Sequence, residues 1–167
     1  EILENLIYDE AAGDLRYRDI RYFLIRPETF CELQKRVEAA LGREAAAEVF
    51  VQGGMTGGVL SGQAYKEKLG LSDAEAFAFM ARMGALIGWG KITLRELDLE
   101  GKRLVVEVEN SAFVAGYGPS DVPVCHTLRG VFHGLATALF GRPVVSQETL
   151  CAAKGDSHCR IEIHEEL

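Results

Sequence analysis

Three cysteines and one glutamate near the C-terminal end most constrain what this chain can fold into. The cysteines are Cys125, Cys151 and Cys159, and with Glu148 they form the pattern C-x22-E-x2-C-x7-C. Zinc binds thiolate and carboxylate ligands, and a structural zinc site takes four of them in a tetrahedron. Four protein ligands leave no open position for water or substrate, so the pattern predicts a structural zinc site that stabilises a fold, with no catalytic residue implied.

Other interpretations of these residues stay open from the spacing alone. Cys125 falls on the apolar side of a helical pattern, where a cysteine often serves as a small buried hydrophobe. Cys151 and Cys159 flank a turn-forming stretch and could form a disulfide across a hairpin. His158 is a substitute ligand for Glu148, although on a strand its side chain would project away from that of Cys159.

Charge and composition exclude several classes of protein. The chain has 25 acidic and 18 basic residues and a net charge of −7, which repels phosphate backbones, so we expect no direct contact with nucleic acid. The most apolar stretch, 76–90, contains Arg82 and is too short to cross a bilayer, so we expect neither a transmembrane segment nor a secretory signal. We therefore expect a cytoplasmic protein without membrane contact, in which thiols stay reduced and available to metal.

The length of 167 residues suits a single domain spanning 1–167. Because the chain begins at Glu1 and not at methionine, we expect it to be part of a longer polypeptide whose output domain lies outside it.

The order of predicted elements indicates an α+β fold. Residues 15–25 are rich in strand formers and end at Pro27, and Ser72 with Glu75 has the form of a helix-capping box. A loop is expected around Gly116 and Gly118. Grouped runs of helices and strands favour an antiparallel sheet over alternating βαβ units. Helices are expected over 29–41, 44–69, 73–87 and 123–140, and strands over 15–25, 91–97, 103–109, 144–150 and 158–164.

Glycines recur in the second predicted helix. Gly54, Gly58 and Gly62 stand at every fourth residue, which forms a smooth groove on one helix face. The groove would admit either a neighbouring helix at close range or a flat ligand. The sequence lacks the Gly-Lys-Ser/Thr ending of a phosphate loop and the strand and acidic residue of a dinucleotide fingerprint.

The third predicted helix is apolar over more than one stripe. Phe77, Met80 and Met83 lie within it, so it is either fully buried or lines a cavity. Trp89 follows it and offers a single N–H donor at the edge of an apolar surface.

Several segments together resemble a known family. Pro123-Val124-Cys125, then 141–145 and 147–159, look like the C-terminal half of the 4-vinyl reductase domain family, and 13–15, 22–29 and 53–62 resemble its N-terminal half. The chain is also similar to the sensor domains of aromatic-hydrocarbon-responsive transcription activators. The resemblance implies that the cysteine and glutamate set holds structural zinc. It also implies an antiparallel sheet with helices on one side, similar to the ligand-binding fold shared with Golgi-transport tethering subunits.

The same resemblance implies a function. It predicts a zinc-braced sensor that binds a small hydrophobic ligand, is a homodimer, and relays occupancy to a separate output domain or partner. The strand that carries a phenol-binding tryptophan in some members reads Leu104-Val105-Val106-Glu107 here, so phenol is disfavoured. The ligand pocket is expected to be formed by Phe77, Met80, Met83, Trp89, Phe113 and Tyr117.

Two further functions stay open. The family name implies an accessory or substrate-binding protein in vinyl-group reduction of tetrapyrrole (chlorophyll-type) biosynthesis. Against an enzyme stand the missing nicotinamide or flavin fingerprint and a metal site without an open position. A protein-interaction scaffold, like the tethering subunits of similar fold, is the other alternative.

Overall fold

The structure is a computed structural model that describes residues 3–166. The ends of the expected domain, Glu1, Ile2 and Leu167, lie outside the described residues. The elements are, in order, η1 (Leu3–Asn5), β1 (Leu6–Asp9), β2 (Asp14–Tyr17), β3 (Ile20–Tyr22), α1 (Pro27–Leu41), α2 (Arg43–Glu67), α3 (Asp73–Leu86), β4 (Lys91–Asp98), β5 (Arg103–Glu109), α4 (Ala112–Tyr117), α5 (His126–Phe140), β6 (Val144–Leu150), η2 (Ala152–Lys154) and β7 (Cys159–Glu165).

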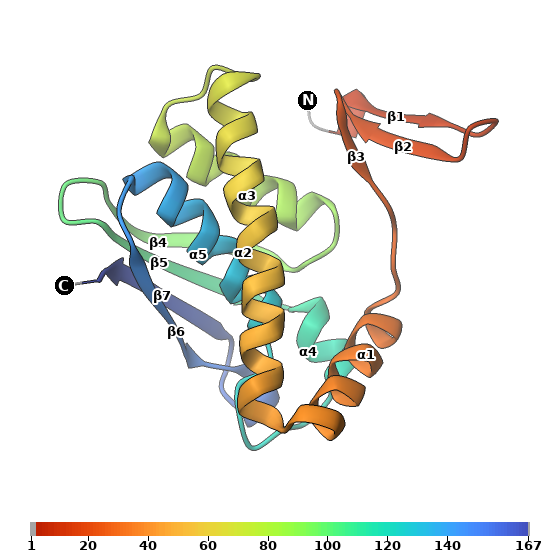
Figure 1. The fold of residues 1–167 in the computed structure, drawn as a ribbon, viewed down its shortest axis with the longest axis vertical. Helices are drawn as coiled ribbons and strands as arrows, with labels where there is room; N and C mark the ends of the chain where they lie inside the picture. Colours follow the sequence, from red (N-terminus) through yellow and green to blue (C-terminus); the bar gives the residue numbers. More distant parts are fainter. Residues whose placement is uncertain (1–2, 167) are drawn as a thin grey trace.

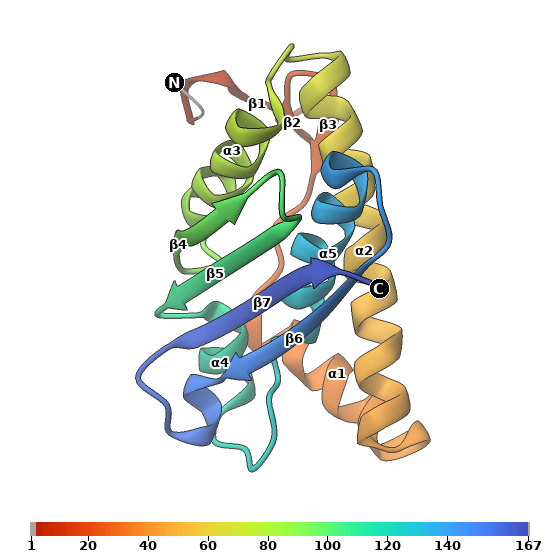
Figure 2. The same ribbon diagram turned by 90° about the vertical axis from the view of Figure 1, so that its left-hand side faces the viewer.

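A four-stranded antiparallel sheet forms the centre of the fold. Its strand order is β4-β5-β7-β6, and α2 and α5 lie on one side of it (Figures 1 and 2). The helix-facing side chains are apolar: Val106 of β5 pairs with Ile161 of β7, and both are fully buried. The predicted α+β class, with an antiparallel sheet covered by helices, is confirmed.

Glycines allow α2 and α5 to pack with their backbones in close contact. A Cβ atom on Gly58 would lie 2.1 Å from the carbonyl oxygen of Val131, and one on Gly54 would lie 2.3 Å from that of Thr127. On the other helix, a Cβ on Gly134 would lie 2.1 Å from the carbonyl oxygen of Met55. The glycine groove is therefore filled by α5, which decides between the two interpretations of this stripe.

α3 lies between two apolar clusters, which explains why more than one of its stripes is apolar. Its N-terminus has the predicted capping box, in which Ser72 accepts from the Glu75 amide and the Glu75 carboxylate accepts from the Ser72 amide. On one side α3 packs into the main core; on the other, Phe79 contacts Tyr17 of the N-terminal sheet, with ring centroids 5.9 Å apart.

The N-terminal region differs from the expected single strand over 15–25. It is a separate three-stranded sheet in the order β1-β2-β3, because Arg18, with φ of +54°, turns the chain back between β2 and β3. After β3, residues Phe23–Arg26 leave the sheet as an extended connecting segment that leads to α1 (Figure 1). Pro27 does not lie beyond the end of a strand, because it occupies the first turn of α1, where its missing N–H has no cost.

The loop expected around Gly116 contains a short helix. α4 spans Ala112–Tyr117, and the Ser111 hydroxyl caps it by accepting from the amide of Val114. Gly116 is required there, because a Cβ atom would lie 2.6 Å from the backbone of Pro27.

Within residues 3–166, none of the helices combines the length and apolar character that a membrane span requires.

Candidate functional site

The four residues of the C-x22-E-x2-C-x7-C pattern come together in the structure. Cys125 precedes α5, Glu148 lies on β6, Cys151 follows β6, and Cys159 begins β7. All four are buried, and one ligand atom from each lies within 4.8 Å of the others. The arrangement ties the first turn of α5 to the two C-terminal strands.

The geometry fits a tetrahedral zinc ion. Zn–S bonds of about 2.3 Å place two thiolates of a tetrahedral site about 3.8 Å apart, and the Sγ atoms of Cys125 and Cys159 are 3.6 Å apart. One carboxylate oxygen of Glu148 accepts the Cys125 amide at 3.0 Å, while the other is buried without a hydrogen-bond partner among the described residues. A metal ion would satisfy that oxygen.

The alternatives for these residues are less well supported. The described cysteines are free thiols, so Cys151 and Cys159 form no disulfide. His158 points away from the cluster, with Nε2 3.4 Å from the carboxylate of Glu107. Glu148 is therefore the carboxylate that completes the donor set.

The electrostatics of the cluster also favour a bound cation. Burial, followed by repulsion from Cys151, raises the pKa of Glu148 to about 8. Hydrogen bonds with the other two thiols, together with burial, raise the pKa of Cys125, while the corresponding hydrogen bonds of Cys159 lower its pKa to about 4. Four acidic groups thus share a small buried volume in which they cannot all ionise. A divalent cation would stabilise their deprotonated forms.

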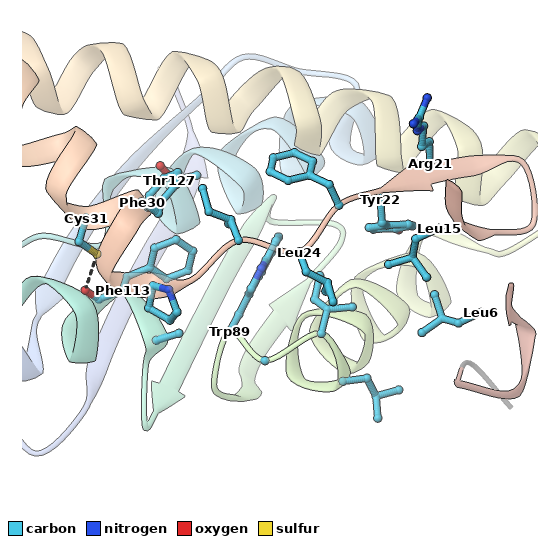
Figure 3. A pocket seen from close by; sticks show the side chains of 17 residues that line it. Leu6, Leu15, Arg21, Tyr22, Leu24, Phe30, Cys31, Trp89, Phe113 and Thr127 are labelled. Carbon is cyan, nitrogen blue, oxygen red and sulfur yellow. Dashed lines mark hydrogen bonds between the residues drawn. The ribbon is translucent and has the colours of Figure 1, made fainter. Parts of the chain in front are cut away.

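A second feature is an apolar cavity of about 480 Å³. It runs beneath the connecting segment, from the N-terminal sheet at one end to α1 and α4 at the other (Figure 3). We call this the apolar cavity. It is lined by Leu6, Leu15, Arg21, Tyr22, Phe23, Leu24, Ile25, Pro27, Phe30, Cys31, Leu86, Ile87, Gly88, Trp89, Ala112, Phe113 and Thr127.

Aromatic rings form the inner wall of the cavity. The ring of Phe113 lies 5.6 Å from that of Phe30 and 6.2 Å from that of Trp89, both at edge-on angles. The backbone of Trp89 is held by Gly84 and Ala112 at 2.9 Å and 3.0 Å. The three rings thus contact one another, and main-chain hydrogen bonds hold the backbone that carries Trp89.

Few polar groups line the apolar cavity. One is the hydroxyl of Thr127, which is buried and has no hydrogen-bond partner among the described residues. The Cys31 thiol donates to the carbonyl oxygen of Phe113 at 3.3 Å, and burial raises the pKa of Cys31 to about 11. The indole N–H of Trp89 takes part in none of the described hydrogen bonds and is a free donor at the wall.

The predicted ligand-binding residues separate into three places. Trp89 and Phe113 line the apolar cavity. Phe77, Met80 and Met83 are buried in the two apolar clusters and lie outside its lining. The hydroxyl of Tyr117 donates to Glu38 at 2.6 Å, also outside the cavity. Sequence reasoning missed Phe30, Cys31 and the connecting segment, whose one signal was the apolar run Phe23-Leu24-Ile25.

Comparison with known proteins places the chain in a family. Residues 1–100 match the family described as activator of aromatic catabolism, and residues 104–165 match the 4-vinyl reductase domain family. The first match alone covers more than half of the chain. The chain belongs to the family of activators of aromatic catabolism. The resemblance to the 4-vinyl reductase domain family and to aromatic-responsive sensors is thereby confirmed.

Individual relatives and solved structures agree with this family assignment. The phenol regulator MopR of Acinetobacter guillouiae is 27% identical over 170 residues, which cover 96% of this chain and 30% of MopR. The chain thus spans about a third of the length of this curated relative. Among solved structures, the phenol-responsive sensory domain of the transcription activator PoxR, solved with phenol, has a TM-score of 0.85 at 22% identity and covers 98% of this chain and 86% of its own.

A trafficking protein particle complex subunit 3 from Naegleria fowleri, covalently bound to palmitic acid, shares the fold. Its TM-score is 0.61 at 11% identity, with 84% of this chain and 95% of that chain covered. The predicted likeness to tethering subunits is confirmed at the level of the fold.

Proposed function

We propose that this chain is the sensory part of a longer, cytoplasmic transcription activator, and that it binds a small aromatic or similarly apolar molecule in the apolar cavity. The observation that carries the proposal is the aromatic wall of Phe30, Trp89 and Phe113 around a space of about 480 Å³. That volume lies in the range of small-molecule sites, which are concave and lined mainly by apolar side chains. Membership of the aromatic-catabolism activator family supports the ligand class.

The chemistry of the wall favours hydrocarbons over phenol. The thiol of Cys31 already donates to a backbone carbonyl, which leaves the indole N–H of Trp89 and the hydroxyl of Thr127 as partners for a ligand oxygen. A ligand hydroxyl brought into this site would exchange its hydrogen bonds to water for bonds to these two groups alone, which disfavours phenol relative to toluene.

We propose zinc as the metal of the four-residue cluster, with a structural role. A zinc ion held by Cys125, Glu148, Cys151 and Cys159 would have no open coordination position. It would brace α5, whose first turn carries Thr127 of the cavity lining two residues after Cys125. The cavity and the metal site would thus share one helical turn. Ligand binding could change an output domain through this turn if the ligand binds one conformation of the sensory part more tightly than another.

Calorimetric titration of the purified domain tests the proposal. We expect toluene to bind with one site per chain and phenol to bind more weakly. Trp89→Ala should weaken toluene binding about 10-fold or more without lowering zinc content, since the indole supplies apolar wall and no metal ligand. Tyr117→Phe is the matched control, because its ring lies outside the cavity and it keeps its apolar body. A folded, metal-loaded domain that binds neither toluene nor phenol would contradict the proposal.

A further inference from the structure

Arg129 is a partly buried cation without a carboxylate partner. Its Nε atom is buried and makes no hydrogen bond within residues 3–166, and none of the ion pairs of those residues includes Arg129. Arg160, on the outer face of the sheet, is in contrast paired with Glu162 at 3.2 Å. Because removing a guanidinium from water costs free energy, a negative charge close to Arg129 is expected to stabilise it.

The side chain of Arg129 lies beside two members of the metal cluster. Its amide donates to the carbonyl oxygen of Cys125 at 2.9 Å, one helical turn earlier, so the two side chains share a face of α5. Its Nη1 donates to the carbonyl oxygen of Ser146 at 3.1 Å. Ser146 and Glu148 are alternate residues of β6 and therefore face the same side of the sheet. The guanidinium is thus held between α5 and β6, next to the cluster.

The cluster carries more negative charge than a zinc ion neutralises. Three thiolates and one carboxylate carry four negative charges and zinc carries two positive ones, so the loaded centre would keep two negative charges in a buried volume. The amide of Cys125, at the start of α5, donates to Glu148 at 3.0 Å and offsets part of this charge. Burial lowers the pKa of Arg129, and attraction to Glu148 opposes that change, as expected for a cation and a carboxylate that interact through the protein.

We propose that Arg129 is the counter-charge of the metal centre, and that its guanidinium offsets part of the negative charge left on the four zinc-bound ligands and so raises the affinity for zinc. Arg129 would act through the ligands without touching the metal, which makes it a positioning residue of the site. The metal centre and the guanidinium would stabilise each other, because each leaves uncompensated charge in a buried place when the other is removed. The inference rests on the proposed zinc site and adds a fifth residue to it.

The zinc affinity of three Arg129 variants tests the inference. The zinc dissociation constant is measured by competition with a chromophoric chelator, in protein whose circular dichroism spectrum matches that of wild type. Arg129→Met keeps the aliphatic bulk and removes the charge, while Arg129→Gln removes the charge and keeps an N–H donor for the Ser146 carbonyl oxygen. We expect both to raise the zinc dissociation constant about 10-fold or more, as is typical for groups that support metal ligands. Arg129→Lys keeps the charge and should recover most of the affinity.

Arg160→Met is the matched control. Arg160 adjoins Cys159 in the sequence, but its side chain points to the opposite face of β7 and pairs with Glu162, so its loss should leave zinc affinity unchanged. Wild-type zinc affinity in Arg129→Gln, affinity as weak in Arg129→Lys as in Arg129→Gln, or equal weakening by Arg160→Met would each overturn the inference. If Arg129→Met does not fold, the Gln and Lys variants still decide. A wild type without zinc contradicts the proposed metal site itself, whereas a zinc-loaded wild type with unaffected variants overturns the counter-charge alone.

Discussion

Two adjacent glycines on α2 should respond in opposite directions to the same substitution. Gly58 faces α5, where an added Cβ would lie 2.1 Å from the carbonyl oxygen of Val131 and 2.7 Å from the amide nitrogen of Leu135. Gly57 is exposed, and an added Cβ there meets nothing within 4 Å. The variants Gly57→Ala and Gly58→Ala therefore share their helix and their chemistry and differ in what the new methyl group contacts.

The magnitudes follow from these contacts. Replacing glycine by alanine inside a helix gains about 1 kcal/mol from backbone entropy and solvation. At Gly58 the 2.1 Å contact must lengthen by about 1.4 Å to restore an ordinary contact distance of about 3.5 Å, so the two helices must move apart. Overpacking costs up to about 3 kcal/mol, and the clashing atoms are backbone, which cannot rotate away. We expect a net loss of about 2 kcal/mol for Gly58→Ala and a gain of up to about 1 kcal/mol for Gly57→Ala.

Differential scanning calorimetry measures both effects. For a domain of this size, 1 kcal/mol corresponds to about 2–4 °C in melting temperature. Gly58→Ala should thus melt about 4–8 °C below wild type, and Gly57→Ala up to about 4 °C above it. If both variants shift the melting temperature in the same direction, the close packing of α2 on α5 would not govern stability here, and the reasoning fails.

Two other predictions concern cysteines. Cys151→Ser should leave less than one zinc per chain in elemental analysis. It should also lower the free energy of unfolding by about 3 kcal/mol or more, since the buried acidic groups lose their cation. A variant that keeps both its zinc and its melting temperature argues against a structural metal. Burial raises the pKa of Cys31 from 9.0 to about 11, so its stability contribution is present below pH 9 and is lost as pH rises towards 11. In urea unfolding, the free energy of unfolding of Cys31→Ala should fall less between pH 9 and pH 11 than that of wild type, by up to about 3 kcal/mol. An identical pH dependence of the two proteins would refute this prediction.

The metal cluster was predictable because ligand chemistry restricts residue types and spacing together. The pattern named Cys125, Glu148, Cys151 and Cys159, and the structure brings these four within reach of one ion. The glycine stripe was predictable as a groove, but its occupant was not, because α5 lies far along the sequence. Gly130 and Gly134 complete that contact from α5, and nothing local in the sequence marks them as its counterparts.

The apolar cavity was harder to predict because it is assembled from distant segments. The sequence indicated that Phe77, Met80 and Met83 lie on a helix too apolar to face water on any side. It did not indicate that the N-terminal sheet covers the second side of that helix, which places these three residues in apolar clusters. Residues 23–25 read as part of a strand, since alternation cannot distinguish a paired strand from an extended segment without partners.

The proposed ligand site has a built-in reporter. Trp89 is the sole tryptophan of the chain and lies on the wall of the apolar cavity, so its fluorescence reports on the surroundings of that wall. If ligand binds there, titration with toluene should change the Trp89 emission saturably, with a midpoint equal to the dissociation constant from calorimetry. Binding heat without any change in Trp89 emission would place the ligand elsewhere in the molecule and contradict the account.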